Sequence, residues 1–214
     1  MMQKKVQIIS DGSLDLSQEL TKEKDIEVVP FYVSFDSETY QKEMVEVGVR
    51  EFYQEMVDHP TVFPKTSMPS VHDYYEVFEK YAKEQLPVIC ICITRKFSGS
   101  LQSATTAKDM ILEEYPDAQI TVIDSTVNTV LQGLYVLEAC RLRDMGLEYQ
   151  QIVDALLPIR ETGRIFFTIG SIDYLKHGGR IGKLAGIAAS ALKIKPVMGS
   201  TDEGAICQLD QARG

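Results

Sequence analysis

The stretch LPVICICITRKFSGSLQSA, residues 86–104, decides the fold of this chain. It begins with a continuous apolar run, which is typical of a parallel strand that is buried on both faces. Cys90 and Cys92 alternate within this run, so we expect both to pack on one face as small buried side chains. A turn rich in serine and glycine follows, and the residues from Ser100 to Tyr115 are predicted to form a helix. A strand, a turn and a helix in this order are typical of an α/β fold.

The same alternation continues along the chain. Asp15 with Gln18, and Ser70 with Asp73, predict capping boxes that open two helices, and residues 127–145 read as another helix. The sequence therefore predicts a mostly parallel sheet with helices on both faces. Strand-like runs occupy residues 6–10, 26–35, 86–94, 118–124 and 164–169.

The composition is that of a folded, acidic protein. Of the 214 residues, 44% are hydrophobic and 25% are charged, which excludes an intrinsically disordered chain. The net charge of −9 argues against nucleic-acid binding and against unaided docking on anionic membranes. No apolar run approaches the ~20 residues that cross a bilayer, and the first residues lack a signal-peptide pattern. We therefore expect no membrane insertion.

The charge is unevenly distributed. Residues 1–159 carry 14 basic and 26 acidic side chains, a net charge of −12, whereas residues 160–195 carry seven basic and two acidic side chains, a net charge of +5. This shift predicts a domain boundary near residue 160, with an N-terminal α/β domain over 1–160 and a second domain over 161–214.

No metal or nucleotide motif is present. The four cysteines have no CxxC spacing, and His59, His72 and His177 lie far apart in the sequence. Neither GxxxxGK[ST] nor GxGxxG occurs. We therefore expect no metal and no nucleotide cofactor, and a reduced, cytoplasmic protein.

Hydroxyl groups gather in loops that are predicted to follow strands. Ser98-Gly99-Ser100 could surround an anion with hydroxyls and backbone N–H groups, or one of its serines could simply cap the next helix. Thr66 and Ser67, before Pro69, could act in the same way, or could only tie their own loop together.

Three further residues have equally open roles. Gly178-Gly179 marks a turn that delivers Arg180, which could bind a carboxylate or phosphate, or form an internal ion pair. Asp11 and Asp124 end predicted strands, where they could orient a hydroxyl or cap a helix.

A serine hydrolase is the alternative from another class. A strand, a turn, a serine and a helix follow one another here, as in a nucleophile elbow, with Ser98 or Ser100 as nucleophile. The segment FSGSLQ lacks the G-x-S-x-G pattern, and no histidine is a clear partner for either serine.

Taken in order, the loops resemble one family. The motifs SDGSLDL (10–16), VVPFYVSF (28–35), TSMPS (66–70), FSGSLQSA (97–104), VIDS (122–125), YLKHGGRIG (174–182) and IKPVM (194–198) are similar to those of the DegV family of fatty-acid-binding proteins. The resemblance extends over essentially the whole chain.

The resemblance implies a two-domain α/β carrier, not an enzyme, that holds one long-chain fatty acid in a buried tunnel between its domains. It implies that Thr66 and Ser98 bind the carboxylate, that Gly99 and Ser100 supply adjacent backbone, and that Arg180 supports them. It also implies a partner, an ATP-dependent fatty-acid kinase subunit, to which the carrier presents the carboxylate for acyl-phosphate formation. No catalytic residue is expected in this chain.

Three departures from the family pattern affect the site. Arg95 and Lys96 place two cations beside the expected head-group site, where the family commonly has small hydroxyl residues and leucine. Met68 replaces a glutamine of the family motif. The family continues for roughly another quarter of its length, so residues 161–214 are expected to form an incomplete second α/β domain.

Overall fold

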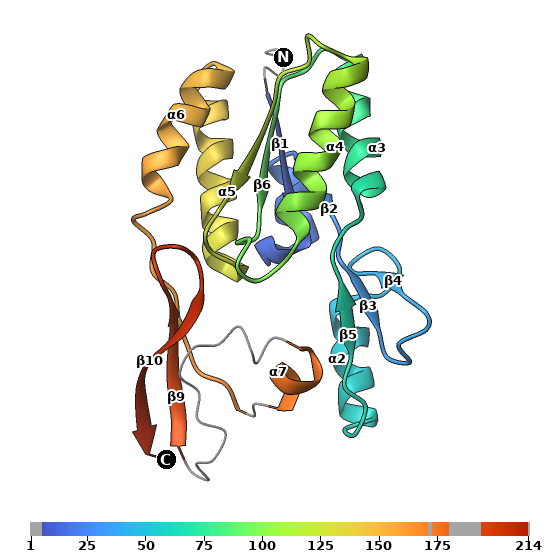
Figure 1. The fold of residues 1–214 in the computed structure, drawn as a ribbon, viewed down its shortest axis with the longest axis vertical. Coiled ribbons are helices and arrows are strands. Elements are labelled where there is room, and N and C mark those ends of the chain that lie inside the picture. The colour runs from blue at the N-terminus through green and yellow to red at the C-terminus, as the bar shows by residue number, and fades with distance from the viewer. Residues whose placement is uncertain (1–5, 171–172, 180–193, 214) are drawn as a thin grey trace.

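A four-stranded parallel sheet forms the centre of the computed structural model, which describes residues 6–170, 173–179 and 194–213 (Figure 1). All three neighbouring pairs of strands are parallel, which confirms the predicted sheet. Its strands, in spatial order, are β2 (Ile26–Val29), β1 (Gln7–Asp11), β6 (Val88–Cys92) and β7 (Ile120–Asp124).

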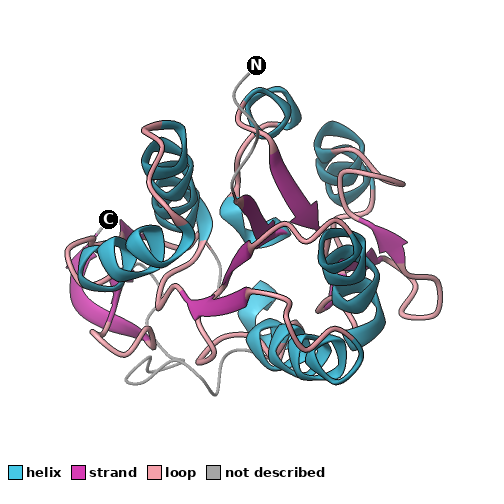
Figure 2. Ribbon diagram, turned by 90° about the horizontal axis from the view of Figure 1, so that it is seen from above, coloured by secondary structure: helices cyan, strands magenta, loops and turns pink. Residues whose placement is uncertain are grey.

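Helices cover both faces of this sheet (Figure 2). Ile8 and Ile9 are consecutive in β1, yet they belong to two different buried clusters, because successive side chains of a strand point to opposite faces. Cys90 and Cys92 are fully buried in the cluster that contains Ile9, as predicted. The helices are α3 (Val71–Lys83) and α4 (Ser100–Glu114) on the face of Ile9, and α5 (Thr129–Asp144) and α6 (Tyr149–Ile159) on the face of Ile8.

The predicted single strand over residues 26–35 is wrong, because the chain leaves the parallel sheet at Pro30. Proline lacks the N–H that a central strand donates to its neighbour, so it favours an end to the pairing there. The next strand, β3 (Tyr32–Ser34), pairs antiparallel with β4 (Gln41–Lys42) and β5 (Lys65–Ser67) in a separate three-stranded sheet. Helix α2 (Val49–Asp58) connects β4 to β5 along the chain.

The capping box predicted at Asp15 is also wrong. Asp15 has φ +49° and ends the short 3-10 helix η1 (Gly12–Leu14). Helix α1 (Gln18–Glu23) begins three residues later, and its N-cap is Ser17, whose Oγ accepts a hydrogen bond from the Leu20 N–H. A serine and an aspartate can each cap a helix, and the left-handed backbone at Asp15 leaves that role to Ser17.

A second antiparallel sheet follows α6, in the order β10-β9-β8. The predicted strand over 164–169 contributes only β8 (Phe166–Phe167), which pairs with β9 (Ile194–Ser200) and not with the parallel sheet. Met198 and Ile206 of this sheet are buried against Phe97. The remaining elements are β10 (Ile206–Arg213) and α7 (Asp173–His177). The part of the chain that the structure describes contains no helix with the length and apolarity needed to cross a membrane.

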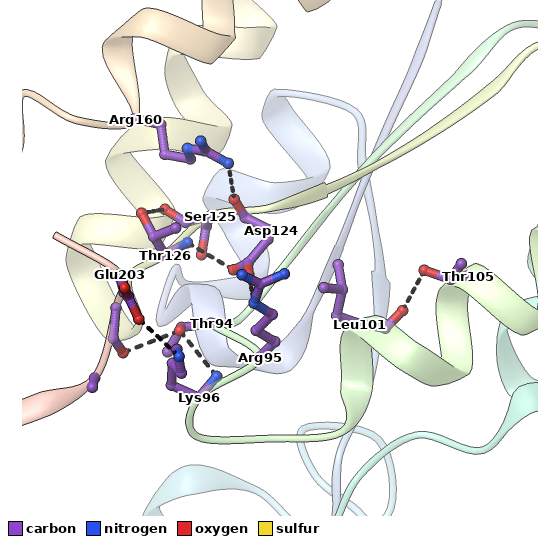
Figure 3. Close-up of polar contacts among 12 residues, drawn as sticks. Thr94, Arg95, Lys96, Leu101, Thr105, Asp124, Ser125, Thr126, Arg160 and Glu203 are labelled. Carbon is purple, nitrogen blue, oxygen red and sulfur yellow. Dashed lines mark hydrogen bonds and ion pairs between the residues drawn. The ribbon is translucent and has the colours of Figure 1, made fainter. Parts of the chain in front are cut away.

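The turn between β9 and β10 contacts the loop that follows β6 (Figure 3). Thr94 Oγ1 donates a 3.0 Å hydrogen bond to the Gly204 carbonyl, and Lys96 Nζ lies 2.9 Å from a carboxylate oxygen of Glu203. Gly204 has φ +82°, and a Cβ there would overlap Thr94 Oγ1 and lie 2.6 Å from the Thr126 carbonyl oxygen. The turn can therefore approach the parallel sheet only because this residue is glycine.

Gly204→Ala is expected to lower the free energy of unfolding by about 2 kcal/mol or more, since it adds steric overlap to the cost of a left-handed backbone. Gly146→Ala is the matched control, because Gly146 has φ +86° and no atom within 4 Å of an added Cβ. It should cost only about 1 kcal/mol. Denaturant unfolding measures both values, and equal losses in the two variants would contradict the close contact at Gly204.

Candidate functional site

The buried carboxyl group of Asp11 accepts hydrogen bonds from both ends of the loop between β6 and α4. Asp11, the last residue of β1, accepts hydrogen bonds on Oδ2 from the Ile93 N–H at 2.9 Å and from the Ser100 hydroxyl at 2.7 Å. Its Oδ1 accepts a 2.8 Å bond from Gln132 Nε2 of α5. Burial raises the pKa of Asp11, and the hydrogen bonds from Gln132, Ile93 and Ser100 oppose that rise.

The two serines of this loop have different environments. Ser100 is buried, and its Oγ lies 2.7 Å from the Tyr74 hydroxyl, which donates to it because the Ser100 hydrogen is directed at Asp11. Ser98 is half-buried, and its Oγ accepts the Ser100 N–H at 3.2 Å. The Ser98 hydroxyl hydrogen thus stays available for a ligand. Gly99 is the N-cap residue of α4, so neither serine takes that position.

Thr66 lies in β5, opposite Val33 of β3, and its side chain is exposed. Among the residues that the structure describes, its hydroxyl has no hydrogen-bond partner. The loop after β5 ends at α3, where Ser70 and Asp73 form the predicted capping box. Thr66 is therefore held in a strand, and its hydroxyl is free to meet a ligand.

Asp73 ties the start of α3 to the small β3–β5 sheet. Its Oδ1 accepts a 2.8 Å hydrogen bond from the Tyr32 hydroxyl of β3 and lies 3.0 Å from Lys42 Nζ of β4. Burial alone would raise the pKa of Asp73, but the hydrogen bonds from Ser70, Tyr32 and Lys42 outweigh it and lower the pKa to about 2. This carboxylate keeps the loop that follows Thr66 in place at neutral pH.

Met68 brings the two hydroxyl loops together. A Cβ on Gly99 would lie 2.6 Å from Met68 Sδ, so the thioether rests directly on the glycine backbone. Helix α7 reaches the same region, because the His177 ring stacks on Phe63 at 3.8 Å and the His177 carbonyl accepts a 3.0 Å bond from Lys65 Nζ. Three of the loops that the sequence singles out therefore adjoin one another. Arg180 lies outside the described residues.

Two hollows flank these loops. The larger, of about 670 Å³, includes Thr66 in its lining and also contains the carboxyl groups of Asp15, Glu19 and Glu43. The smaller, of about 140 Å³, is mostly apolar, with Asn128 and Thr129 as its polar lining residues, and lies between the loops after β6 and β7 and the second sheet. Its apolar lining consists of Phe97, Ile165, Phe167, Ile169, Met198 and Ile206.

The cations Arg95 and Lys96 each pair with a carboxylate. Arg95 Nε lies 3.6 Å from a carboxylate oxygen of Asp124, and Lys96 pairs with Glu203, as described above (Figure 3). Asp124 Oδ1 also accepts the Thr126 N–H at 2.9 Å, which is a structural role. These charges therefore join the loops to one another and to the second sheet.

The arrangement gives no support to a serine hydrolase. All three histidines of the chain are engaged elsewhere: His59 with Glu55, His72 with Glu76, and His177 with the Asp173 carbonyl. No histidine is therefore in place to accept a proton from Ser98 or Ser100. The described residues also contain no cluster of histidine, cysteine and carboxylate side chains that could hold a metal ion.

Comparison with known proteins identifies the family. The model of the family described as "Uncharacterised protein, DegV family" matches residues 5–214. The chain belongs to the DegV family. A DegV domain-containing protein from Clostridium perfringens is 31% identical over 208 residues, which are 97% of this chain and 72% of that protein.

Solved structures of DegV-like proteins share this fold. A stearic acid-binding protein from Eubacterium ventriosum is 46% identical, with a TM-score of 0.90 over 98% of this chain and 71% of that protein. A DegV family protein from Thermus thermophilus, whose structure concerns fatty-acid binding, is 28% identical, with a TM-score of 0.82 over 98% of this chain and 72% of that protein.

The structure of this DegV protein adds residues that the sequence does not single out. Gln132 and Tyr74 both contact the buried network around Asp11, yet they lie within ordinary helical patterns. Tyr74 belongs to an apolar stripe, and its hydroxyl gives no signal in the sequence. Gln132 is a fully buried amide, which only the fold reveals.

Asp73→Asn is expected to destabilise this DegV protein by about 1–3 kcal/mol at pH 7, since it removes a charged acceptor of several hydrogen bonds. Because the folded pKa of Asp73 is lowered to about 2, its stabilisation is present above the unfolded pKa and is lost as the pH falls toward 2. The stability difference between wild type and variant should therefore shrink between pH 4 and pH 2. Urea unfolding at several pH values measures it, with the exposed Asp117→Asn as control. A constant difference would contradict this role.

Proposed function

We propose that this protein binds a long-chain fatty acid, with its carboxylate at the Thr66 and Ser98 loops and its tail between the parallel sheet and the second sheet. The observation that carries the proposal is the likeness to the stearic acid-binding protein from Eubacterium ventriosum, at 46% identity and a TM-score of 0.90. The paired hydroxyl loops described above support it.

The head group requires hydrogen-bond donors, because a buried carboxylate without partners is costly. Ser98 has a hydroxyl hydrogen to donate, since its oxygen already accepts the Ser100 N–H. Thr66 supplies a second hydroxyl, and Gly99 and Ser100 bring backbone close to the ligand. Arg180 is a supporting cation in this proposal. Hydroxyl donors leave a carboxylate oxygen more nucleophilic than a tight ion pair would.

The tail supplies most of the affinity. About 15 methylenes at about 0.8 kcal/mol each offer roughly 12 kcal/mol of transfer free energy before the costs of binding. The apolar hollow beside Phe97 is the better place for the tail, because the larger hollow contains three carboxyl groups. At about 140 Å³ the apolar hollow is smaller than the 300–1,000 Å³ usual for a ligand site, so it would hold one end of a tail.

The carrier would act together with a kinase. In this proposal it presents the carboxylate to an ATP-dependent fatty-acid kinase subunit in the cytoplasm. A carboxylate oxygen attacks the γ-phosphorus of ATP, ADP leaves, and an acyl-phosphate forms. This chain contributes no catalytic residue, in keeping with the absence of a phosphate-binding loop in its sequence.

Native mass spectrometry of the purified protein is expected to find one bound fatty acid of roughly C14–C18, since a tail of this length buries enough methylenes for tight binding. Protein without lipid should take up added stearate. Thr66→Ala and Ser98→Ala should each weaken stearate binding about tenfold, since each removes a buried hydrogen bond to a charged group.

Ser67→Ala is the matched control for these two variants. Ser67 neighbours Thr66 in the same exposed strand, and its hydroxyl has only a 3.5 Å contact with the Met68 carbonyl. Absence of lipid, together with no uptake of added stearate, would reject the carrier. Unchanged binding by both Thr66→Ala and Ser98→Ala would reject the head-group site but not the carrier.

Addition of a fatty-acid kinase subunit and ATP to the loaded protein is expected to produce an acyl-phosphate, trapped with hydroxylamine as the hydroxamate. Omission of the carrier, the kinase or ATP should abolish the product. Product formed at the same rate from free fatty acid without the carrier would contradict the presenting role.

A further inference from the structure

One carboxylate oxygen closes the loop that contains Ser98. Asp11 Oδ2 accepts the Ile93 N–H at the start of this loop and the Ser100 hydroxyl at its end. Asp11 can reach both because it ends β1, the strand beside β6 in the parallel sheet. The two ends of the loop are therefore held at a fixed separation by a residue that lies outside it.

The hydrogen bond between Asp11 and Ser100 also affects the position of the Ser98 hydroxyl. The Ser100 hydroxyl donates to Asp11 and accepts from Tyr74, so this residue is held by contacts on two elements besides its own helix. Its backbone N–H then donates to Ser98 Oγ at 3.2 Å. The position of Ser98 Oγ, and the direction left for its hydrogen, thus depend on Ser100.

Asp11 is itself held from the opposite face of the sheet. Gln132 Nε2 of α5 donates to Asp11 Oδ1 at 2.8 Å and to Ser10 Oγ at 3.0 Å, and Gln132 is fully buried. Contacts from α5, from Ile93 and from α4 therefore meet at one carboxyl group. Such a group has little freedom to change its rotamer.

This carboxyl group is expensive to bury. Asp11 is completely buried, and no cationic side chain among the described residues lies within 4 Å of it. Burial raises its pKa, so an ionised Asp11 lowers stability as the pH rises through the folded pKa. The donors around Asp11 are buried as well, so removal of its carboxyl group would leave the Ile93 N–H, the Ser100 hydroxyl and Gln132 Nε2 without this acceptor.

We propose that Asp11 is the positioning residue of the head-group site: it closes the Ile93–Ser100 loop and thereby aims the Ser98 hydroxyl at the fatty-acid carboxylate. This inference rests on the proposed function. Asp11 does not touch the ligand, so it acts on the head group only and leaves the tail unaffected.

The test compares stearate with octadecanol, which has the same tail length but no carboxylate. Asp11→Ala should weaken stearate binding at least tenfold and change octadecanol binding less than twofold. Asp11→Asn should restore most of the stearate affinity, because the Asn Oδ1 accepts both loop bonds. In that variant Gln132 can turn its amide, so that its Oε1 accepts from the new Asn Nδ2 and the bond from Gln132 Nε2 to Ser10 Oγ is given up.

Controls separate positioning from general damage. Tyr135→Phe removes a buried 2.8 Å hydrogen bond to the Leu156 carbonyl, away from the loop, and should leave binding of both ligands unchanged. Ser100→Ala removes the hydroxyl that donates to Asp11, keeps the backbone N–H that donates to Ser98 Oγ, and decides the matter if Asp11→Ala does not fold. Stearate binding equal to wild type in folded Asp11→Ala and Ser100→Ala, or equal losses for both ligands in these variants, would overturn the proposal.

Amide hydrogen exchange tests the loop without any ligand. Exchange of the Ile93 N–H should accelerate at least tenfold in Asp11→Ala, and in Asp11→Asn it should stay near the wild-type rate. A wild-type protein that binds no stearate would reject the proposed function, while the exchange rates would still decide whether Asp11 holds the loop. Unchanged exchange at Ile93 in Asp11→Ala would overturn the positioning role.

Discussion

The burial of a parallel sheet on both faces is the constraint on which the rest of this structure depends. Ile8 and Ile9 pack into different clusters on the two sides of β1, so helices must cover both faces. Parallel strands place all their carboxyl ends at one edge, and the loops that follow them meet there. Ser98, Asp11 and Asp124 come to the same edge for this reason.

Two carboxyl groups organise that edge through opposite environments. Asp11 is buried without a cation, and burial raises its pKa, so it works as a fixed acceptor inside the protein. Asp73 is also largely buried, but Lys42 lies beside it, and its hydrogen bonds lower its pKa to about 2. Asp11 holds the loop of Ser98, and Asp73 anchors the segment after Thr66. The two hydroxyl groups are thus supported separately, and Met68 joins their loops at Gly99.

The sequence predicts the parts of this fold that depend on local pattern. Cys90 and Cys92 alternate within an apolar run, and Ser70 and Asp73 have the spacing of a capping box, so both predictions are confirmed. A sequence pattern cannot decide between two neighbouring residues that can both cap a helix. Asp15 is the predicted cap, but Ser17 caps the helix in the structure. The apolar run over residues 26–35 predicts one strand, because an apolar pattern does not show which sheet a strand joins. In the structure β2 and β3 belong to different sheets.

The candidate site was predictable as a set of loops and not as a set of contacts. Strand ends and hydroxyl residues locate Thr66 and Ser98, and their role in binding stays a prediction. The ion pairs of Arg95 and Lys96 could not be predicted from the sequence, because their partners come from distant segments. These partners are Asp124 in β7 and Glu203 in the β9–β10 turn.

These partners give the loop of Ser98 a second set of contacts. Asp11 holds it from inside the parallel sheet, while Gly204 and Glu203 hold its outer side through Thr94 and Lys96. Any shift of the second sheet must therefore either break these outer contacts or strain the loop against Asp11. The ion pair at Lys96 is exposed to solvent and contributes little, whereas the hydrogen bond from Thr94 to Gly204 is buried like the bonds to Asp11. The shape of the loop therefore depends on the second sheet through Gly204 as well as on the parallel sheet through Asp11.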